Sequence, residues 1–415
     1  MTPVLTMDIC PDTAADGAAN RVGTLRRQYR YRQAWQRQAS RARYRVCTGG
    51  DEATMALAIY LLLAAVLLAG TLLPVLPVAH GLVRVGDFPR QQYLALALVL
   101  LAAAPFVADW TAIWLGVLAV LAATAFVQIA LIAEFTPLAR KQSSGFDPRQ
   151  DDGDAFRLVA ANVKMSNRQR EAMRAELARA DPDILVLMEV DDGWAETLSS
   201  LTGRYPHVVS RPQNNSYGMI VASKLELADI VVDCLLTADV PSVVTTVRTK
   251  AGRLFRLYAI HPEPPVPHRG TTGRDGETAL VALRARKETR PVVVTGDLND
   301  VAWSKTTRRF RRLSRLLDPR IGRSVFSTFD ARIPLLRWPL DHLFHSAEFR
   351  LAGMRRLAPC GSDHFPVAFD LVLCSEPDAD SHPQPADGDD VAHARELVES
   401  ARKRDEKPIG GDWET

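Results

Sequence analysis

Polar side chains that could bind a metal or transfer a proton fall at the ends of predicted strands. The clearest case is V-V-V-T-G-D-L-N-D at Val292–Asp300, where a β-branched apolar run typical of a strand buried on both faces stops at Gly296. Asp297 and Asn299 follow, and they point the same way if strand geometry continues. A carboxylate and a carboxamide at the mouth of a buried strand are costly to desolvate without polar partners. Asp297 and Asn299 are therefore the first candidates for chemistry.

Five further clusters of acids, amides and histidines occupy equivalent places, each at or just beyond the end of a predicted strand. They are Asn162, Glu189, His261, Asp341 with His342, and Asp363 with His364. Six such clusters are expected only if the strand ends converge on one site. Converging carboxylates repel each other, and a bound cation would relieve that repulsion. Oxygen donors without cysteine suit Mg²⁺ or Mn²⁺ rather than zinc, and nearby histidines could act as acid and base on a phosphorus centre.

The elements that must position these residues are strands mixed with helices. Short β-branched runs predict the strands, and apolar residues at helical spacing predict the helices. Together they indicate an α+β domain with two sheets and outer helices. The predicted strands are 156–163, 184–188, 219–222, 230–232, 243–248, 254–260, the run from 292, 340–344 and 367–373; the predicted helices are 166–180, 277–289 and 305–316.

Helix 305–316 is strongly basic. Its cations could bind a polyanion, or they could form a solvated helix face, since they spread around the helix. They are Lys305, Arg308, Arg309, Arg311, Arg312 and Arg315.

Three apolar segments precede this domain, at about 56–77, 91–108 and 111–133. The stretch Ala53–Leu82 contains no Asp, Glu, Lys or Arg, which meets the requirement of about 20 apolar residues for a transmembrane helix. A secretory signal peptide is the alternative for the first segment, but further apolar segments follow it. The prediction is three membrane spans.

The charge of the chain is unevenly distributed along its length. Nine arginines and no acid lie between Arg21 and Arg45, whereas twelve acids face five basic residues between Glu376 and Glu414. The basic head could contact nucleic acid or anionic lipid, flank the first span on the cytoplasmic side, or result from a gene start placed too early, with Met55 the true beginning. A cytoplasmic head and three crossings place everything after Glu134 outside the cytoplasm.

The predicted organisation has five parts. The acidic tail is poor in large apolar groups and is expected to be disordered. Five cysteines without paired spacing argue against a disulfide framework or a zinc site. The parts are a basic, disordered cytoplasmic head (1–52), a transmembrane region (53–135), a polar linker (136–154), the mixed domain (155–374) and the acidic tail (375–415).

The chain resembles the endonuclease/exonuclease/phosphatase superfamily, the DNase-I-like phosphohydrolases, in six motifs of matching order and spacing. They are A-N-V, L-M-E-V, I-H-P, G-D-L-N-D, L-D-H-L-F and G-S-D-H-F-P. The resemblance covers residues 156–373. It implies a four-layer α/β/β/α sandwich, which agrees with the α+β pattern and would here be preceded by about three transmembrane helices.

The resemblance also implies roles for the metal-binding and phosphate-binding positions. Glu189 would be the main ligand of Mg²⁺ or Mn²⁺, helped by Asn162 and Asp363. Asp297 would orient or deprotonate the attacking water, while Asn299 would hold a phosphate oxygen.

Three further positions would handle protons and charge. His364 would contact the phosphate as a base or an electrostatic stabiliser, and Asp341 would fix its tautomer. His261 would be the general acid for the leaving oxygen. His342 directly follows Asp341 and would point the other way on a strand, so it is not assigned to the site.

These expectations favour a membrane-tethered phosphoester hydrolase that acts outside the cytoplasm on a lipid-linked phosphate or pyrophosphate. The span-plus-domain layout resembles that of the glycopeptide-resistance phosphatases. One alternative is an extracytoplasmic nuclease, for which helix 305–316 would supply the basic track. Another is a non-catalytic membrane-bound binding module. The expected partners are the lipid bilayer of the inner or plasma membrane and a phosphoester, either a lipid phosphate or a nucleic acid. No protein partner is evident.

Overall fold

The computed structural model describes residues 54–378, 381 and 385–411 of the 415-residue chain. The predicted disordered head, residues 1–52, lies outside the described residues. The described chain divides into two compact units. One unit contains residues 54–63 and 103–117, and the other contains residues 64–102 together with everything after 117.

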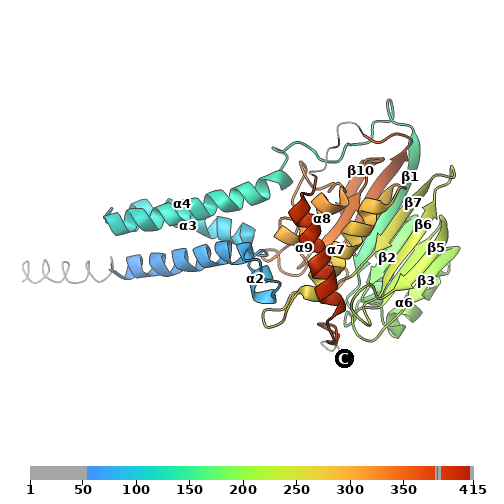
Figure 1. Cartoon of the computed structure of the whole chain (residues 1–415), viewed down its shortest axis with the longest axis horizontal. Helices are drawn as coiled ribbons and strands as arrows, with labels where there is room; N and C mark the ends of the chain where they lie inside the picture. The colour runs from blue at the N-terminus through green and yellow to red at the C-terminus, as the bar shows by residue number, and fades with distance from the viewer. Residues whose placement is uncertain (1–53, 379–380, 382–384, 412–415) are drawn as a thin grey trace, which may run out of the picture. The chain divides into compact units, whose positions relative to one another are not determined.

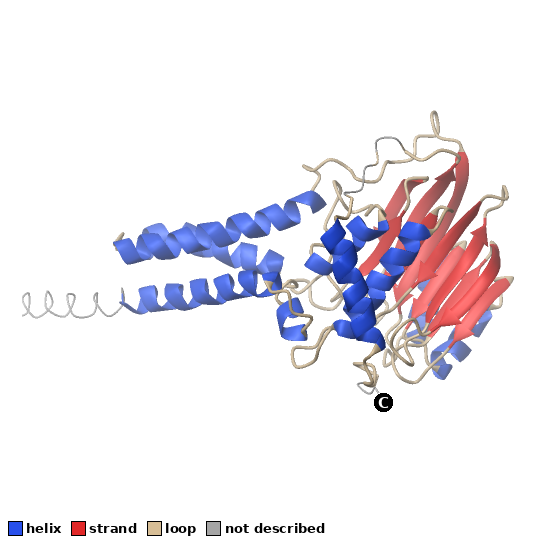
Figure 2. Cartoon of the chain, in the orientation of Figure 1, coloured by secondary structure: helices blue, strands red, loops and turns tan. Residues whose placement is uncertain are grey.

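Three helices are long and apolar enough to cross a membrane: Thr54–Val75, Arg90–Val107 and Ala112–Phe135. Their ends agree with the predicted spans to within two residues. The first helix ends in the 3-10 turn η1 (Leu73–Val75), the second is α3 (Arg90–Val107), and the third comprises α4 (Ala112–Ile132) and the turn η2 (Ala133–Phe135). In the chain, a short helix, α2 (Gly81–Val85), follows the first apolar helix and precedes the second. Figure 2 shows these segments as helices.

The mixed domain contains two sheets, as predicted. The first has six strands in the order β10-β11-β1-β2-β4-β3. Strands β1 and β2 are parallel and the other neighbours are antiparallel. The strands are β1 (Gly153–Asn162), β2 (Ile184–Met188), β3 (His207–Arg211), β4 (Met219–Ser223), β10 (Phe349–Arg356) and β11 (Val367–Cys374).

The second sheet has five strands in the order β5-β6-β7-β8-β9. Strands β7 and β8 are parallel, and β9 returns antiparallel to β8 with Asp341 opposite Asp297. The strands are β5 (Glu226–Asp233), β6 (Ser242–Arg248), β7 (Leu254–Ala259), β8 (Val292–Asp297) and β9 (Asp341–His345).

Strand β1 shows why the domain has four layers. Successive side chains of a strand point to opposite faces of the sheet. Phe156 and Leu158 therefore join the core between the two sheets, where Phe156 stacks on Phe255 of β7 at 5.2 Å between ring centres. Val159 and Ala161 face the other way and pack under helices. An apolar run without polar alternation is thus buried on both sides.

Helices cover the outer face of each sheet, which completes the predicted α/β/β/α sandwich (Figure 1). Apolar residues of α5 and α6 pack on the six-stranded sheet, and those of α7, α8 and α9 pack on the five-stranded sheet. The helices are α5 (Arg170–Ala180), α6 (Asp192–Thr202), α7 (Thr272–Lys287), α8 (Lys305–Ser314) and α9 (Gly388–Arg402).

The prediction that the tail is disordered is wrong for the residues that form a helix within it. Gly388–Arg402 forms α9, with Asp387 capping its first turn. The acidic composition conceals an apolar stripe at helical spacing. Ala394 and Val398 belong to this stripe and pack into the core beneath the helix. Beyond the helix, Arg404 forms an ion pair with buried Glu263.

The predicted linker is also partly built into the domain. Strand β1 begins at Gly153, within the segment 136–154. Ser143 Oγ lies 2.7 Å from His345 Nε2, and both residues are buried. Polar composition concealed this packing, because the hydrogen-bond partner lies 202 residues away in the sequence.

Glu277, buried inside α7, makes the stability of the domain depend on pH. Burial raises its pKa from 4.5 to about 8, with a hydrogen bond from Ser242 opposing the shift and Glu263 adding to it. The folded state thus holds a proton that the unfolded state has lost between pH 4.5 and about 8, so stability falls as pH rises through this window. We expect Glu277→Gln to stabilise the protein by on the order of 3 kcal/mol at pH 7. The gain should vanish near pH 4; thermal unfolding at both pH values tests this, and a gain independent of pH would contradict it.

Candidate active site

The catalytic candidates meet where the two sheets come together. Asn162 ends β1 and Glu189 follows β2 in one sheet, while Asp297 ends β8 and Asp341 begins β9 in the other. The Asn162 side chain joins the sheets, because its Nδ2 donates to Glu189 Oε1 at 2.6 Å and to Asp297 Oδ2 at 3.1 Å. The predicted convergence of strand ends is therefore present in the structure.

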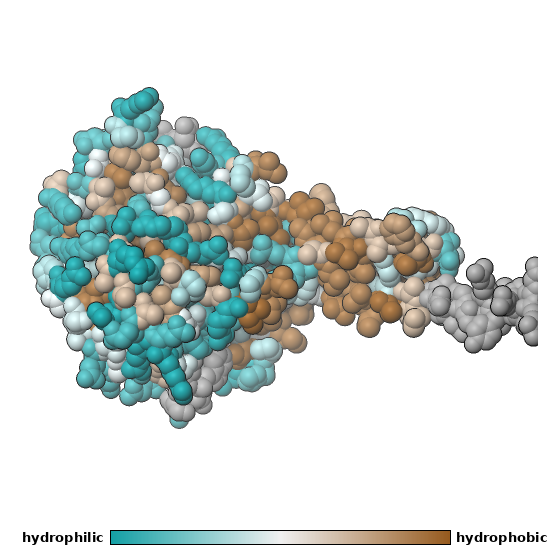
Figure 3. Space-filling view, turned by 180° about the vertical axis from the view of Figure 1, so that it is seen from behind, coloured by the Kyte–Doolittle hydropathy of each residue, from teal (hydrophilic) through white to brown (hydrophobic). Residues whose placement is uncertain are grey.

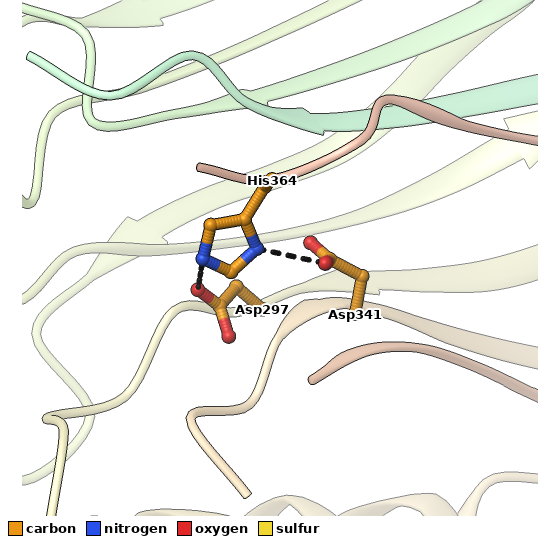
Figure 4. Close-up of side chains that lie close together, drawn as sticks. All are labelled: Asp297, Asp341 and His364. Carbon is orange, nitrogen blue, oxygen red and sulfur yellow. Dashed lines mark hydrogen bonds and ion pairs between the residues drawn. The ribbon is translucent and has the colours of Figure 1, made fainter. Parts of the chain in front are cut away.

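His364 lies between two carboxylates (Figure 4). Its Nδ1 is 2.8 Å from Asp341 Oδ2, and its Nε2 is 3.4 Å from Asp297 Oδ2. Burial alone would lower the pKa of His364, but the charges of Asp341 and Asp297 outweigh burial and raise it to about 10. Potential ligand atoms of the three residues lie within 4.8 Å of one another, so this group could also hold a metal ion.

His261 approaches the same carboxylate oxygen of Asp297. Its Nε2 is 3.8 Å from Asp297 Oδ2, and its ring centre lies 5.4 Å from that of Tyr217. Burial lowers the pKa of His261 below 6.5, against the opposing effect of Asp297. His261 Nδ1 is buried and has no hydrogen-bond partner among the described residues. Two histidines beside one aspartate therefore have pKa values shifted in opposite directions: the pKa of His364 is raised and that of His261 is lowered.

The loop after β8 needs an unusual backbone to present Asp297 and Asn299. Gly296 has φ +144°, and a Cβ there would lie 1.9 Å from the carbonyl oxygen of Ile260, so only glycine fits. Asn299 has φ +51°, a strained value for a residue with a side chain. Its backbone N–H donates to Asp297 Oδ1 at 2.9 Å, and its Nδ2 donates to the carbonyl of Pro262. These contacts orient the Asp297 carboxylate toward the histidines.

The three residues expected to bind the metal are only partly grouped. Glu189 and Asn162 are in direct contact, and the Glu189 backbone is held at φ +59°. Asp363 instead pairs its Oδ2 with Lys164 Nζ at 2.8 Å and with Arg332 at 3.5 Å.

The oxygens of this region suit a divalent cation. Glu189 and Asp297 line the same cavity, and the amide of Asn162 lies between them. Carboxylate and amide oxygens are the hard donors that Mg²⁺ and Mn²⁺ prefer. The donor set thus fits a hard divalent ion.

The cavity over these residues has a volume of about 360 Å³, and one part of its wall is apolar. The polar part includes Glu189, Asp297, Asn299, His261, Asp363 and His364; the apolar part consists of Phe88, Pro264, Pro265, Phe329 and Leu340.

Several residues of the site were not predicted from the sequence. Lys164 lines the cavity and pairs with Asp363, and its position two residues after Asn162 was the available signal. Ser362 Oγ donates to the carbonyl of Asn162 and accepts from the backbone of His364, which fixes the S-D-H loop on β1. Phe88 lies 209 residues from Asp297 in the sequence, and no local pattern marks it.

Residues 159–364 match the model of the endonuclease/exonuclease/phosphatase family. They form a domain of this family. Members of the family are phosphoesterases and nucleases, and the site of this chain is consistent with a metal-dependent phosphohydrolase. No curated protein sequence matches the chain.

Three solved structures are among those that the chain is similar to. A humanized D. rerio TDP2 is 16% identical, covers 52% of this chain and 98% of its own, and has a TM-score of 0.41. The human Nocturnin catalytic domain with bound sulfate is 16% identical, with 53% and 95% covered and a TM-score of 0.43. An endonuclease/exonuclease/phosphatase from Bacteroides vulgatus is 19% identical, with 53% and 99% covered and a TM-score of 0.42.

Asp341 is predicted to act by holding His364. Asp341→Asn should keep the fold but remove the negative charge beside Nδ1, and we expect kcat to fall about 10²- to 10⁴-fold with KM little changed. Steady-state kinetics of phosphate release from a soluble phosphoester would measure this. Asp233→Asn, at an exposed position on β5, is the matched control. Full kcat in the Asp341 variant would exclude the role.

Proposed function

We propose that the protein is anchored in the cytoplasmic membrane by three transmembrane helices and hydrolyses a lipid-linked phosphate or pyrophosphate outside the cytoplasm. One observation carries the proposal. Phe88, in the loop between the first two apolar helices, lines the same cavity as Glu189 and His364. The apolar helix α3 begins two residues later, at Arg90. A cavity with such a wall would open at the surface of the bilayer.

Buried polar contacts hold this loop on the catalytic domain. Arg84 donates from Nε and from a terminal nitrogen to Asp275 Oδ2, at 3.1 and 2.9 Å. Trp303 Nε1 donates to the carbonyl of Asp87 at 2.7 Å. Arg84 and Asp275 are at most 4% exposed, and breaking a buried ion pair leaves an uncompensated charge. The position of Phe88 in the cavity wall is thus strongly constrained.

Exposed apolar residues in one loop of the domain support the proposal that the cavity faces lipid. Leu335 and Leu336 are 83% and 41% exposed. Gln92, in the first turn of α3, donates its Nε2 to the carbonyl of Leu335 at 2.7 Å, so this loop lies beside the start of an apolar helix. Hydrophobic side chains also cover much of the surface of the apolar helices (Figure 3). Exposed apolar groups of this kind favour contact with a membrane.

The same contacts fit the predicted topology. The loop between the first two helices touches the catalytic domain, so both would lie on one side of a membrane that these helices cross. An even number of crossings separates this loop from the chain after Phe135, as the second and third helices would provide. The arginines before the first helix favour a cytoplasmic N-terminus, which would put the domain outside the cytoplasm.

The residues of the site have complementary tasks in phosphoester hydrolysis. Asp297, oriented by the Asn299 backbone, would orient or deprotonate water, and the Asn299 side chain would hold a phosphate oxygen. His261 would deliver a proton to the leaving oxygen, which requires its imidazolium form although burial lowers its pKa. His364, fixed by Asp341, would stabilise negative charge on the phosphate.

In this proposal the metal ion would bind beside the six-stranded sheet. Glu189 and Asn162 would hold Mg²⁺ or Mn²⁺, with Asp363 turning from Lys164 to contribute an oxygen. When bound, the ion would act as a Lewis acid toward a phosphoryl oxygen.

A nuclease would need a basic track leading to the site. The arginines of α8 do not line the catalytic cavity in the described part of the chain. Arg311 and Arg312 form ion pairs with Glu134 and Asp390 instead. We therefore propose a lipid substrate rather than a nucleic acid. The turnover experiment below tests the nuclease function as the alternative.

Hydrolysis by the purified full-length protein with Mg²⁺ or Mn²⁺ tests the function. Polyprenyl pyrophosphate, a phospholipid and DNA are compared in parallel; hydrolysis is followed as phosphate release from the pyrophosphate and as cleavage products from the two phosphodiesters. We expect turnover of a lipid substrate, its loss with a chelator, and a fall of at least about 10²-fold in Glu189→Gln, Asp363→Ala and His364→Ala. Cleavage of DNA alone would replace the lipid proposal with the nuclease.

Phe88 is predicted to affect lipid substrates selectively. Phe88→Ala should raise KM for the lipid about tenfold or more, since a buried Phe side chain contributes about 1.5–3 kcal/mol. The kcat/KM for a soluble phosphoester such as p-nitrophenyl phosphate should stay unchanged. Leu138→Ala, at a position 96% exposed and outside the cavity, is the control. Equal losses on lipid and soluble substrates would show that Phe88 does not contact the lipid.

A further inference from the structure

A second cavity, of about 430 Å³, lies between the end of α4 and helix α8. No described residue lines both this cavity and the catalytic one. Its wall combines the last turn of an apolar helix with a cluster of cations. The charged residues of this basic pocket are Arg140, Lys141, Arg308, Arg311, Arg312 and the single acid Glu134.

The positive charge of the basic pocket is only partly neutralised within the protein. Glu134 accepts from Arg311 at 2.8 Å, and Arg312 forms an ion pair with Asp390 at 2.7 Å. The guanidinium group of Arg308 makes no hydrogen bond or ion pair with any described residue; only its backbone N–H donates, to the carbonyl of Ser304. The Nε of Arg311 is buried and has no acceptor in the described chain. Partly buried guanidinium groups without acceptors are costly, and an anion in the pocket would supply them.

The excess of positive charge in the basic pocket also affects the pKa of Arg308. Burial lowers its pKa, and the nearby charges of Arg90 and Arg311 add to that effect against Asp87 and Glu134. A bound anion would stabilise the charged form. The α8 side chains therefore do not form a simple solvated face, which was one of the two readings of this basic helix.

The position of the pocket indicates where the anion comes from. Ala130 and Leu131 line it and belong to the apolar helix Ala112–Phe135. Phe126 lies one helical turn before Ala130 on the same face and is 72% exposed. An apolar helix face that leads into a cationic pocket at its end matches an acyl chain followed by a phosphate. Basic pockets beside transmembrane helices bind anionic lipid headgroups in this manner.

We propose that the basic pocket binds the phosphate headgroup of an anionic phospholipid that is not the substrate. The bound lipid bridges α4 and α8 and holds the catalytic domain against the membrane surface. This site requires that α4 enters the bilayer, but it does not depend on which phosphoester the catalytic cavity hydrolyses.

Lipid-dependent thermal stability of the detergent-purified full-length protein tests the proposal. A lipid that binds only the folded state raises the melting temperature in proportion to its affinity. Phosphatidylglycerol is titrated against phosphatidylcholine, and inorganic phosphate is titrated separately. We expect saturable stabilisation by phosphatidylglycerol alone.

The variant to test is Arg308→Gln combined with Lys141→Gln. Each cation near a membrane surface accounts for about a fivefold change in affinity, so the double variant should bind phosphatidylglycerol about thirtyfold more weakly. Arg308→Lys should retain most of the affinity. Arg315→Gln removes an exposed charge just after α8, outside the pocket, and should bind like the wild type. Hydrolysis of a soluble phosphoester should be unchanged in all variants.

Three results would overturn the site. They are wild-type affinity for phosphatidylglycerol in the double variant, an equal loss in Arg315→Gln, and stabilisation by inorganic phosphate at the concentrations where the lipid acts. The first would remove the pocket from lipid binding, the second would show a general charge effect, and the third would assign the pocket to a small soluble anion. None of them concerns the catalytic proposal, which is tested by turnover.

Discussion

The buried carboxylate of Asp275 connects the loop between the apolar helices to the catalytic loop. Its two oxygens accept from Arg84 on one side and from Arg274 on the other. Arg274 also donates to the carbonyl of Asn299, within the loop that presents Asp297. Burial raises the pKa of Asp275, but Arg274 and Arg84 outweigh burial and keep it below its usual value, so the carboxylate stays charged. Because each charge in this network compensates another, neither loop can move far without leaving a buried ion unpaired.

The catalytic geometry depends equally on the meeting of two sheets. Strand β1 ends at Asn162, and Glu189 directly follows the end of β2 at Met188. Strands β8 and β9 bring Asp297 opposite Asp341. The apolar core between the sheets sets their separation, and the Asn162 amide closes the remaining gap to Asp297. The strained backbones of Glu189 and Asn299 are held by this rigid surrounding structure. Side chains fixed in this way are preorganised for a phosphate and a cation.

Two cavities give the protein two proposed relationships with a membrane. The catalytic cavity has the Phe88 wall beside the start of α3, and the basic pocket adjoins the end of α4. These helix ends would lie on the same side of a bilayer if both helices cross it. An apolar wall at one cavity suits the tail of a substrate, whereas guanidinium groups at the other suit a headgroup. Both cavities would then draw ligands from the same leaflet, where tethering raises the effective concentration of the catalytic domain.

The sequence by itself determined the elements and the chemical types of the site. Valine-rich runs predicted buried strands, apolar segments predicted three long helices, and motifs such as G-D-L-N-D placed Asp297 and Asn299 at a strand end, because these features depend on local periodicity. Only the tertiary structure decided that Asp363 pairs with Lys164, that α9 packs on the sandwich, and that Phe88 enters the catalytic cavity. Those contacts join residues far apart in the chain, and their energies depend on burial and on facing charges that no local pattern contains.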